Sequence, residues 1–147
     1  MFANVQSRLF PSVEGSVPRR LLVVDGAEES RRTLADYFSA RGYEVLVAAD
    51  GLDALVQAIR RSVDTVIMSA SLPGLEGYEA AGILRQLIPG LRIILTVEPD
   101  AERHRHASRR RERFLCFAKP LELEDLAAEL ESGRAVPEAE TDEEGPR

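Results

Sequence analysis

The chain has 147 residues and a formal net charge of −6 at pH 7, and both values limit what it can be. This length suits one domain with some residues left for tails, and a hydrophobic content of 44% supports a buried core. The single cysteine, Cys116, excludes an intramolecular disulfide. We find no signal peptide and no stretch long enough to span a membrane, so we expect a cytoplasmic protein. The acidic balance argues against nucleic-acid binding over the whole surface.

Two terminal stretches lack the pattern of folded structure. Residues 1–18 contain two prolines and a glycine with no apolar period, so we expect a flexible leader. Packing of the leader against the domain is an alternative, because it contains four large apolar residues: Phe2, Val5, Leu9 and Phe10. Residues 133–147 are acidic, and we expect a disordered tail too short and too polar to form an output domain. The folded domain is then expected over residues 19–132.

Between these tails, short apolar runs alternate with helical patterns. The apolar runs predict strands at residues 20–24, 43–48, 63–68, 91–97 and 114–118. Apolar spacing and end signals predict helices at residues 28–41, 52–61, 77–88 and 123–131. In the second helix we expect Leu55, Val56 and Ile59 to face inward. The alternation predicts βαβ units, and hence a parallel sheet with helices on both faces.

Local signals support the predicted helix boundaries. Glu28 and Glu29 fall in the first turn of the first helix, where the helix dipole favours negative charge. Gly42 is expected to end that helix, because glycine adopts the left-handed conformation at helix C-termini. Asp50 is expected to cap the second helix through its side-chain oxygen.

Polar residues stand at the ends of four predicted strands. Asp25 follows the first strand, Ser69 ends the third, Thr96 ends the fourth and Lys119 ends the fifth. The carboxyl ends of parallel strands lie along one edge of the sheet, where open α/β folds bind their ligands. We therefore expect these four side chains to converge.

The order and spacing of several motifs resemble the receiver domain of two-component response regulators. The matching segments are VVDG at 23–26, GYEV at 42–45, ADGLDAL at 49–55, LPGLEG at 72–77, ILT at 94–96 and AKP at 118–120. The resemblance covers about residues 19–130, nearly all of the predicted domain. It implies an α/β fold of the flavodoxin-like (CheY-like) type, a doubly wound sheet of five parallel strands in the order 2-1-3-4-5.

The resemblance also implies that the reactive centre is degenerate. Receiver domains take a phosphoryl group from a histidine kinase onto an aspartate, with magnesium held by a pair of acidic residues. Ser69 stands at the phosphoacceptor position, Asp25 matches the first acidic residue and Gly26 replaces the second. A serine hydroxyl without an adjacent base is a poor nucleophile, and magnesium prefers carboxylate ligands. We therefore expect a pseudo-receiver that is not an enzyme and binds magnesium weakly or not at all.

Three further positions carry over from the family, each with a plainer interpretation beside it. Thr96 matches the switch hydroxyl but is also a common strand-end residue. Lys119 matches the lysine that contacts phosphoryl oxygens, although it is equally free to pair with Asp25, which itself could cap the following helix. Cys116 stands where an aromatic switch residue is frequent, and a buried cysteine is commonly inert. The family typically has a cis bond between Lys119 and Pro120, which we expect here.

A basic cluster at residues 101–113 falls where receivers place their fourth helix. Its arginines are Arg103, Arg105, Arg109, Arg110, Arg111 and Arg113. Three interpretations stay open: a solvated basic face, a docking surface for an acidic partner, or a contact with nucleic-acid phosphates. The cluster has no interleaved aromatic residues, which disfavours the nucleic-acid interpretation.

The hypothesis that we favour is a stand-alone pseudo-receiver that works as a protein-interaction module in two-component (phosphorelay) signal transduction. Its expected partner is a signalling protein, such as a histidine kinase, a chemosensory protein or another regulator. A homodimer could use the face of the fourth helix, fifth strand and fifth helix. Two alternatives remain. One is a nucleic-acid-associated regulator that uses the arginine cluster, and the other is a sensor of a small anion held by Lys119 and Thr96 in the vacated pocket.

Overall fold

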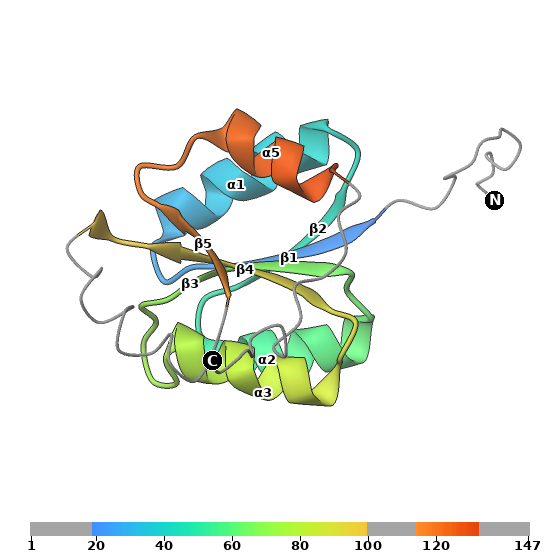
Figure 1. Ribbon diagram of the computed structural model, residues 1–147, viewed down its shortest axis with the longest axis vertical. Helices are drawn as coiled ribbons and strands as arrows, with labels where there is room; N and C mark the ends of the chain where they lie inside the picture. Colours follow the sequence, from blue (N-terminus) through green and yellow to red (C-terminus); the bar gives the residue numbers. More distant parts are fainter. Residues whose placement is uncertain (1–18, 100–113, 133–147) are drawn as a thin grey trace, which may run out of the picture.

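A computed structural model of the chain describes residues 19–99 and 114–132. In these residues five parallel strands form one sheet in the order β2-β1-β3-β4-β5, as the resemblance implied. The strands are β1 Arg20–Val24, β2 Glu44–Ala48, β3 Thr65–Ser69, β4 Arg92–Val97 and β5 Leu115–Ala118. The helices are α1 Glu28–Ala40, α2 Gly51–Arg61, α3 Gly77–Leu87 and α5 Leu123–Leu130. Helices α1 and α5 cover one face of the sheet, and α2 and α3 cover the other (Figure 1).

The middle of the sheet is built from the most apolar segments of the chain. All residues of β3 are buried, and β1 is buried from Leu21 onward. Strands that are covered on both faces read as continuous apolar runs, which is why these segments are recognisable in the sequence. The edge strands β2 and β5 are only partly buried. The sheet therefore has a dry centre and two more solvated edges.

The predicted helix signals act as expected. The Asp50 carboxylate accepts a hydrogen bond from the Asp53 N–H at 2.8 Å and caps α2. Gly42 follows α1 with a φ of 99°, a conformation that glycine adopts without steric cost. These local interactions fix where α1 ends and where α2 begins.

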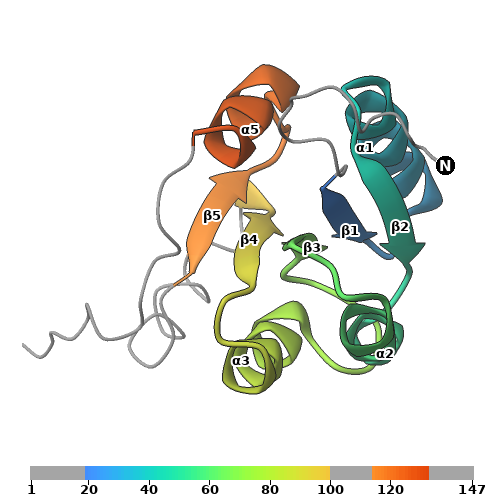
Figure 2. The ribbon, with the colours of Figure 1, turned by 90° about the vertical axis from the view of Figure 1, so that its right-hand side faces the viewer.

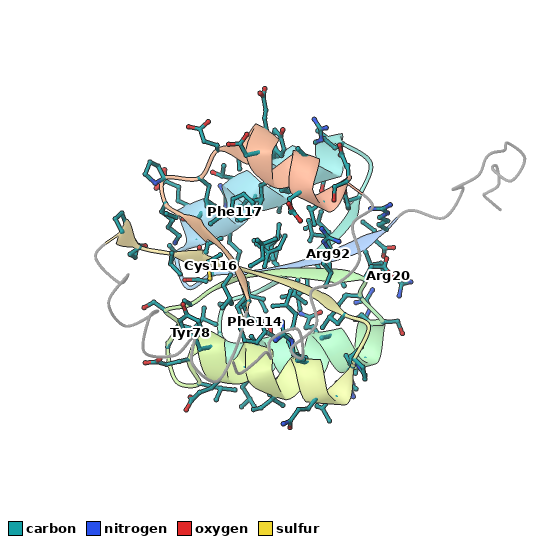
Figure 3. The ribbon with its side chains drawn as sticks, in the orientation of Figure 1. Arg20, Tyr78, Arg92, Phe114, Cys116 and Phe117 are labelled. Atoms are coloured by element: carbon teal, nitrogen blue, oxygen red, sulfur yellow. The ribbon has the colours of Figure 1, made fainter. Side chains whose placement is uncertain are left out.

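The hydrophobic core forms two clusters, one on each face of the sheet. Along β4, Leu95 belongs to the cluster under α2 and α3, whereas Ile94 belongs to the cluster under α1 and α5. The same alternation holds along β5, where Cys116 and Phe114, the residue directly before the strand, pack with the first cluster and Phe117 packs with the second. In Figure 3, Phe114 lies next to α3 and Phe117 on the side of α1 and α5.

One predicted packing pattern is wrong. Val56 and Ile59 of α2 were expected to face inward, but they are 44% and 55% exposed. The buried face of this helix consists instead of small residues, chiefly Ala54 and Ala58, while Leu55 packs at its margin. Small side chains allow a helix to lie close to the sheet, so α2 is rotated relative to the orientation that its largest apolar residues suggest.

Candidate functional site

The four polar strand-end residues lie along one edge of the sheet. The β1–β3 register pairs Val24 with Met68, so that Asp25 and Ser69 follow on adjacent strands. The β3–β4 register pairs Ser69 directly with Thr96. Asp25, Ser69 and Thr96 are all buried. The strand order thus brings these residues to one edge, as the sequence predicted.

Asp25 uses both oxygens of its carboxylate. Oδ1 accepts a hydrogen bond from the Ala27 N–H at 2.9 Å, and Oδ2 lies 3.2 Å from the Lys119 ammonium. Ala27 is the N-cap residue of α1, and its own side chain makes no capping hydrogen bond. Asp25 is therefore not the N-cap residue that it was expected to be, although its carboxylate satisfies the N–H of that residue at the start of α1. The aspartate instead ties the loop after β1 to the end of β5.

Lys119 lies between two carboxylates. Its Nζ atom is 3.2 Å from Asp25 Oδ2 and 3.3 Å from Glu98 Oε2. Its backbone N–H donates to the Val97 carbonyl at 2.8 Å, which positions the side chain beyond the strand ends. The peptide bond that precedes Pro120 is cis, as expected.

Glu98 was not predicted from the sequence. This residue directly follows β4, two residues after Thr96, and its place at a strand end is the one feature that could have suggested it. Its side chain is 52% exposed, whereas that of Lys119 is 19% exposed. Glu98 therefore closes the ion-pair cluster on its solvent side.

The Ser69 hydroxyl is engaged within its own turn. Its Oγ atom donates to the Ser71 carbonyl at 3.0 Å and accepts from the Ser71 N–H at 3.2 Å. The start of α3 packs against the same backbone, because a Cβ atom on Gly77 would lie 2.1 Å from the Ser69 carbonyl oxygen. The hydroxyl proton thus points to a carbonyl that cannot act as a base.

The two remaining positions contribute little polar chemistry to this edge. Cys116 is half-buried, and its thiol contacts the Phe114 carbonyl oxygen at 3.5 Å. It packs with the core cluster under α2 and α3, away from the α1 side. At Gly26 an added Cβ would lie 3.3 Å from Pro73 Cδ, so a side chain there requires only a small shift of the proline. Position 26 therefore has room for a Cβ atom beside Pro73.

Comparisons with known proteins place this chain in a family. The sequence model of the response regulator receiver domain matches residues 21–131, and the chain belongs to this family. It is 32% identical over 130 residues to "Response regulator MprA" of Mycobacterium sp. (strain KMS), covering 88% of this chain and 55% of the relative. The chain thus spans about half the length of that curated relative.

Two other relatives show the same domain in different settings. The chain is 30% identical over 128 residues to "Sensor histidine kinase RcsC" of Escherichia coli (strain K12), covering 87% of this chain and 14% of the relative. A putative response regulator from Chloroflexus aurantiacus J-10-fl superposes with a TM-score of 0.72 and 29% identity, covering 79% of this chain and 97% of the other. Receiver domains interact with signalling partners such as histidine kinases.

The donor set at this edge does not fit the magnesium ion that the family uses. Of the three positions to which the resemblance assigns carboxylates, only position 25 carries one, and both oxygens of Asp25 are already engaged. Within residues 19–99 and 114–132, no group of three or more histidine, cysteine, aspartate or glutamate side chains is arranged to hold a metal ion. A hard cation that needs several oxygen ligands would have to displace Lys119 first.

Other sequence predictions fall on residues that the structure does not describe. The arginine cluster at 101–113 and both tails lie outside the described residues. The dimer face that includes this cluster is therefore described only for β5 and α5. Among the described helices, none combines the length and the apolar character that a membrane crossing requires.

Proposed function

We propose that this receiver domain works in two-component signalling through protein contacts that do not depend on phosphorylation of an aspartate. The observation that carries the proposal is the position of Lys119, whose ammonium is held by Asp25 and Glu98 while the Ser69 hydroxyl bonds within its own turn. The residue that would stabilise a phosphoryl group is thus paired with two carboxylates, and the residue that would receive it is hydrogen-bonded within its own turn.

The chemistry of Ser69 supports the absence of phosphotransfer. A serine attacks phosphorus efficiently only when a neighbouring base removes its proton. The hydroxyl of Ser69 donates to a carbonyl oxygen, which is not basic. Transfer also needs positive charge near the leaving oxygens, and Asp25 and Glu98 already neutralise Lys119. The site therefore lacks both the nucleophile and the free charge for the reaction.

A receiver domain that accepts no phosphoryl group cannot be regulated as a phosphorylation switch is. In a two-state receiver, a ligand shifts the population only through its different affinity for the two states. The chain cannot be biased by a phosphoryl group that it does not accept. We infer that partner binding, and not covalent modification, selects its conformation, and that the partner is a signalling protein.

The anion-sensor alternative is less favoured by this geometry. An anion at Lys119 would compete with two carboxylates and would bring a further negative charge next to them. The nucleic-acid alternative depends on the arginine cluster, which lies outside the described residues. No contact among the described residues favours either alternative.

The direct test is incubation of the full chain with acetyl phosphate and Mg²⁺, followed by intact mass spectrometry. We expect no mass increase for the wild-type chain. Near-stoichiometric addition of one phosphoryl group would overturn the proposal. The double variant Gly26→Asp/Ser69→Asp restores all three carboxylates, and we expect it to be labelled through an acyl phosphate that hydroxylamine cleaves.

A matched control tests whether labelling depends on the position of the added carboxylate or only on the added negative charge. Ser71 is exposed and lies two residues after Ser69, so Gly26→Asp/Ser71→Asp adds the same two carboxylates with one of them outside the strand-end position. This control should stay unlabelled. If both double variants were labelled equally, the lack of a carboxylate at position 69 would not explain why the wild-type chain is not labelled.

A second experiment tests the nature of the partner. The tagged chain is used to capture proteins from its native lysate, with and without nuclease, and the eluates are identified by mass spectrometry. We expect signalling proteins that survive nuclease and are lost in the variant Arg109→Glu/Arg110→Glu/Arg111→Glu. Recovery of partners only through nucleic acid would contradict the interaction-module proposal and support the nucleic-acid alternative.

A further inference from the structure

Helices α2 and α3 carry a set of large apolar side chains that the core does not use. Their exposed fractions range from 38% to 65%. We call this set the α2–α3 valley, and its members are Leu52, Val56 and Ile59 of α2 with Ile83 and Leu87 of α3. Exposed apolar residues that occur singly are normal, but a contiguous set indicates a surface that binds something.

The two apolar stripes face each other. Gln57 donates from Nε2 to the Val47 carbonyl at 3.1 Å, which identifies the flank of α2 that faces β2. At 100° per residue, the stripe of Leu52, Val56 and Ile59 lies on the opposite flank. Because α2 and α3 lie side by side under the sheet, that flank faces α3 (Figure 2).

The corresponding flank of α3 is identified by a cation–π contact. The Arg85 guanidinium lies 4.0 Å from the centroid of the Phe114 ring, on the side of α3 that faces β5. Ile83 and Leu87 occupy the other flank and therefore face α2. The valley thus runs between the two helices.

The valley opens into a groove at the C-terminal ends of both helices. The groove has a volume of about 530 Å³. Its lining combines Ile59 of α2 and Leu87 of α3 with the segment that leads into β3: Ser62, Val63 and Asp64. Ligand sites of several hundred Å³ accommodate a few bulky side chains.

The chain enters the domain beside this groove. The backbone N–H of Arg20 donates to Asp64 Oδ2 at 2.8 Å, and the Arg20 guanidinium donates to the Arg61 carbonyl. Asp64 lines the groove, and Arg61 directly precedes Ser62, which also lines it. Arg20 lies at the edge of the molecule where β1 begins (Figure 3). The residues that precede Arg20 therefore start next to the open end of the valley.

We propose that residues 1–18 bind back into the α2–α3 valley of the same chain. This segment contains two of the five phenylalanines of the chain, Phe2 and Phe10, together with Val5 and Leu9. An extended chain covers about 3.3 Å per residue, so the nine residue-to-residue steps from Arg19 back to Phe10 reach about 30 Å. The 11 residues of α2 are about 16 Å long. The tether is therefore long enough to place these side chains along the whole valley.

The covalent connection favours this occupant over a second copy of the chain. A tethered segment acts at an effective concentration of about a millimolar, and it avoids the entropy that two separate molecules lose on association. The acidic tail at 133–147 offers only one large aliphatic side chain, Val136, and many charges. The leader is the segment outside the described residues whose apolar side chains suit an apolar groove.

The proposal is tested by paramagnetic relaxation enhancement on the full chain. A nitroxide is attached at Ser7→Cys in a Cys116→Ser background, where the serine hydroxyl keeps a donor toward the Phe114 carbonyl. We expect loss of amide signals around Ile59 and Leu87, and retained signals on α1 and α5. Weak broadening spread evenly over all faces would overturn the proposal.

Variants and a mixing experiment decide the remaining outcomes. Leu9→Ser/Phe10→Ser and Ile59→Ser should each restore the lost signals, whereas Val47→Ser, at an exposed residue outside the valley, should not. In a mixture of nitroxide-labelled protein without ¹⁵N and ¹⁵N-labelled protein without nitroxide, we expect no broadening. Broadening in this mixture would identify a second copy as the occupant and would contradict the proposal.

Discussion

The Lys119 ammonium lies 3.2 Å from Asp25 Oδ2 and so connects β5 to β1, two strands that are separated in the sheet by β3 and β4. The Asp25 side chain is 6% exposed, whereas the Lys119 side chain is 19% exposed. An ion pair with one buried member is asymmetric, because the loss of the lysine leaves a carboxylate without its counter-charge in a poorly solvated position.

Replacement of the lysine should destabilise the fold. We expect Lys119→Met to lower the free energy of unfolding by about 1–3 kcal/mol, the usual cost of an unsatisfied buried group. Asp25→Asn/Lys119→Met should recover part of this loss, because it removes the uncompensated charge. Urea denaturation of the wild type, Lys119→Met, Asp25→Asn and the double variant measures the coupling free energy between the two side chains. A coupling energy of zero would show that the pair is only a surface contact.

A second ion pair allows a comparison of buried and exposed pairs in one chain. Arg92 and Glu129 are 2.7 Å apart and 12% exposed, whereas Arg32 and Glu28 are 3.0 Å apart and about 70% exposed. We expect Glu129→Gln to cost about 1–3 kcal/mol and Glu28→Gln less than about 0.5 kcal/mol. Urea midpoints of the two variants test this difference. Similar midpoints would mean that the burial of the first pair has no energetic consequence.

Two glycines provide a steric test of the packing behind Ser69. A Cβ atom on Gly77 would lie 2.1 Å from the Ser69 carbonyl oxygen and 2.7 Å from Ala70 Cα, whereas nothing lies within 4 Å of one on Gly90. Backbone atoms cannot move aside as a flexible side chain does, so Gly77→Ala should cost about 3 kcal/mol or more. Gly90→Ala should change stability by less than about 0.5 kcal/mol. Thermal unfolding of both variants distinguishes these effects, and a stable Gly77→Ala protein would disprove the close contact.

Tyr43 should contribute a pH dependence at alkaline pH. Burial raises the pKa of its phenol above the usual value of 10.0; Glu131 raises it further, and Arg19 opposes the shift. Because the folded state binds this proton more tightly than the unfolded state, the contribution is complete below about pH 10 and is lost as the pH rises through the raised pKa. Wild-type protein should therefore lose more stability than Tyr43→Phe between about pH 9 and about pH 11. Parallel losses in urea titrations at the two pH values would contradict this expectation.

The sequence was most informative where the backbone is buried on both sides. The predicted strand at residues 20–24 coincides with β1, and the strand predicted at 63–68 shares residues 65–68 with β3. Continuous apolar runs have no other stable place in a soluble α/β fold. The convergence of Asp25, Ser69 and Thr96 followed from the strand order alone.

The sequence was less informative about the rotation of helix α2 and about which exposed charged side chains pair with each other. The inward face of α2 was assigned from large side chains, but the close approach of Ala54 and Ala58 to the sheet determined it. Glu98 was missed because a single glutamate after a strand has no distinguishing pattern until the position of Lys119 is known. Helix rotation and side-chain pairing both depend on contacts between distant segments, which periodicity does not encode. The boundaries of the tails and the roles of the site residues stay predictions.

Ion pairs link β5 and α5 to the rest of the domain, whereas the central strands β1 and β3 are held mainly by apolar contacts. Links between charged side chains run from Lys119 to Asp25, from Glu129 to Arg92 and from Glu131 to Arg41. Dissolved ions weaken such links, most of all the exposed one at Glu131, but leave the apolar contacts of β1 and β3 almost unchanged. Added salt should therefore make β5 and α5 separate from β4 more often, although the buried Leu126 and Leu130 of α5 still hold that helix to the core. Amide hydrogen exchange in these two elements should accelerate with added salt before it does in β3.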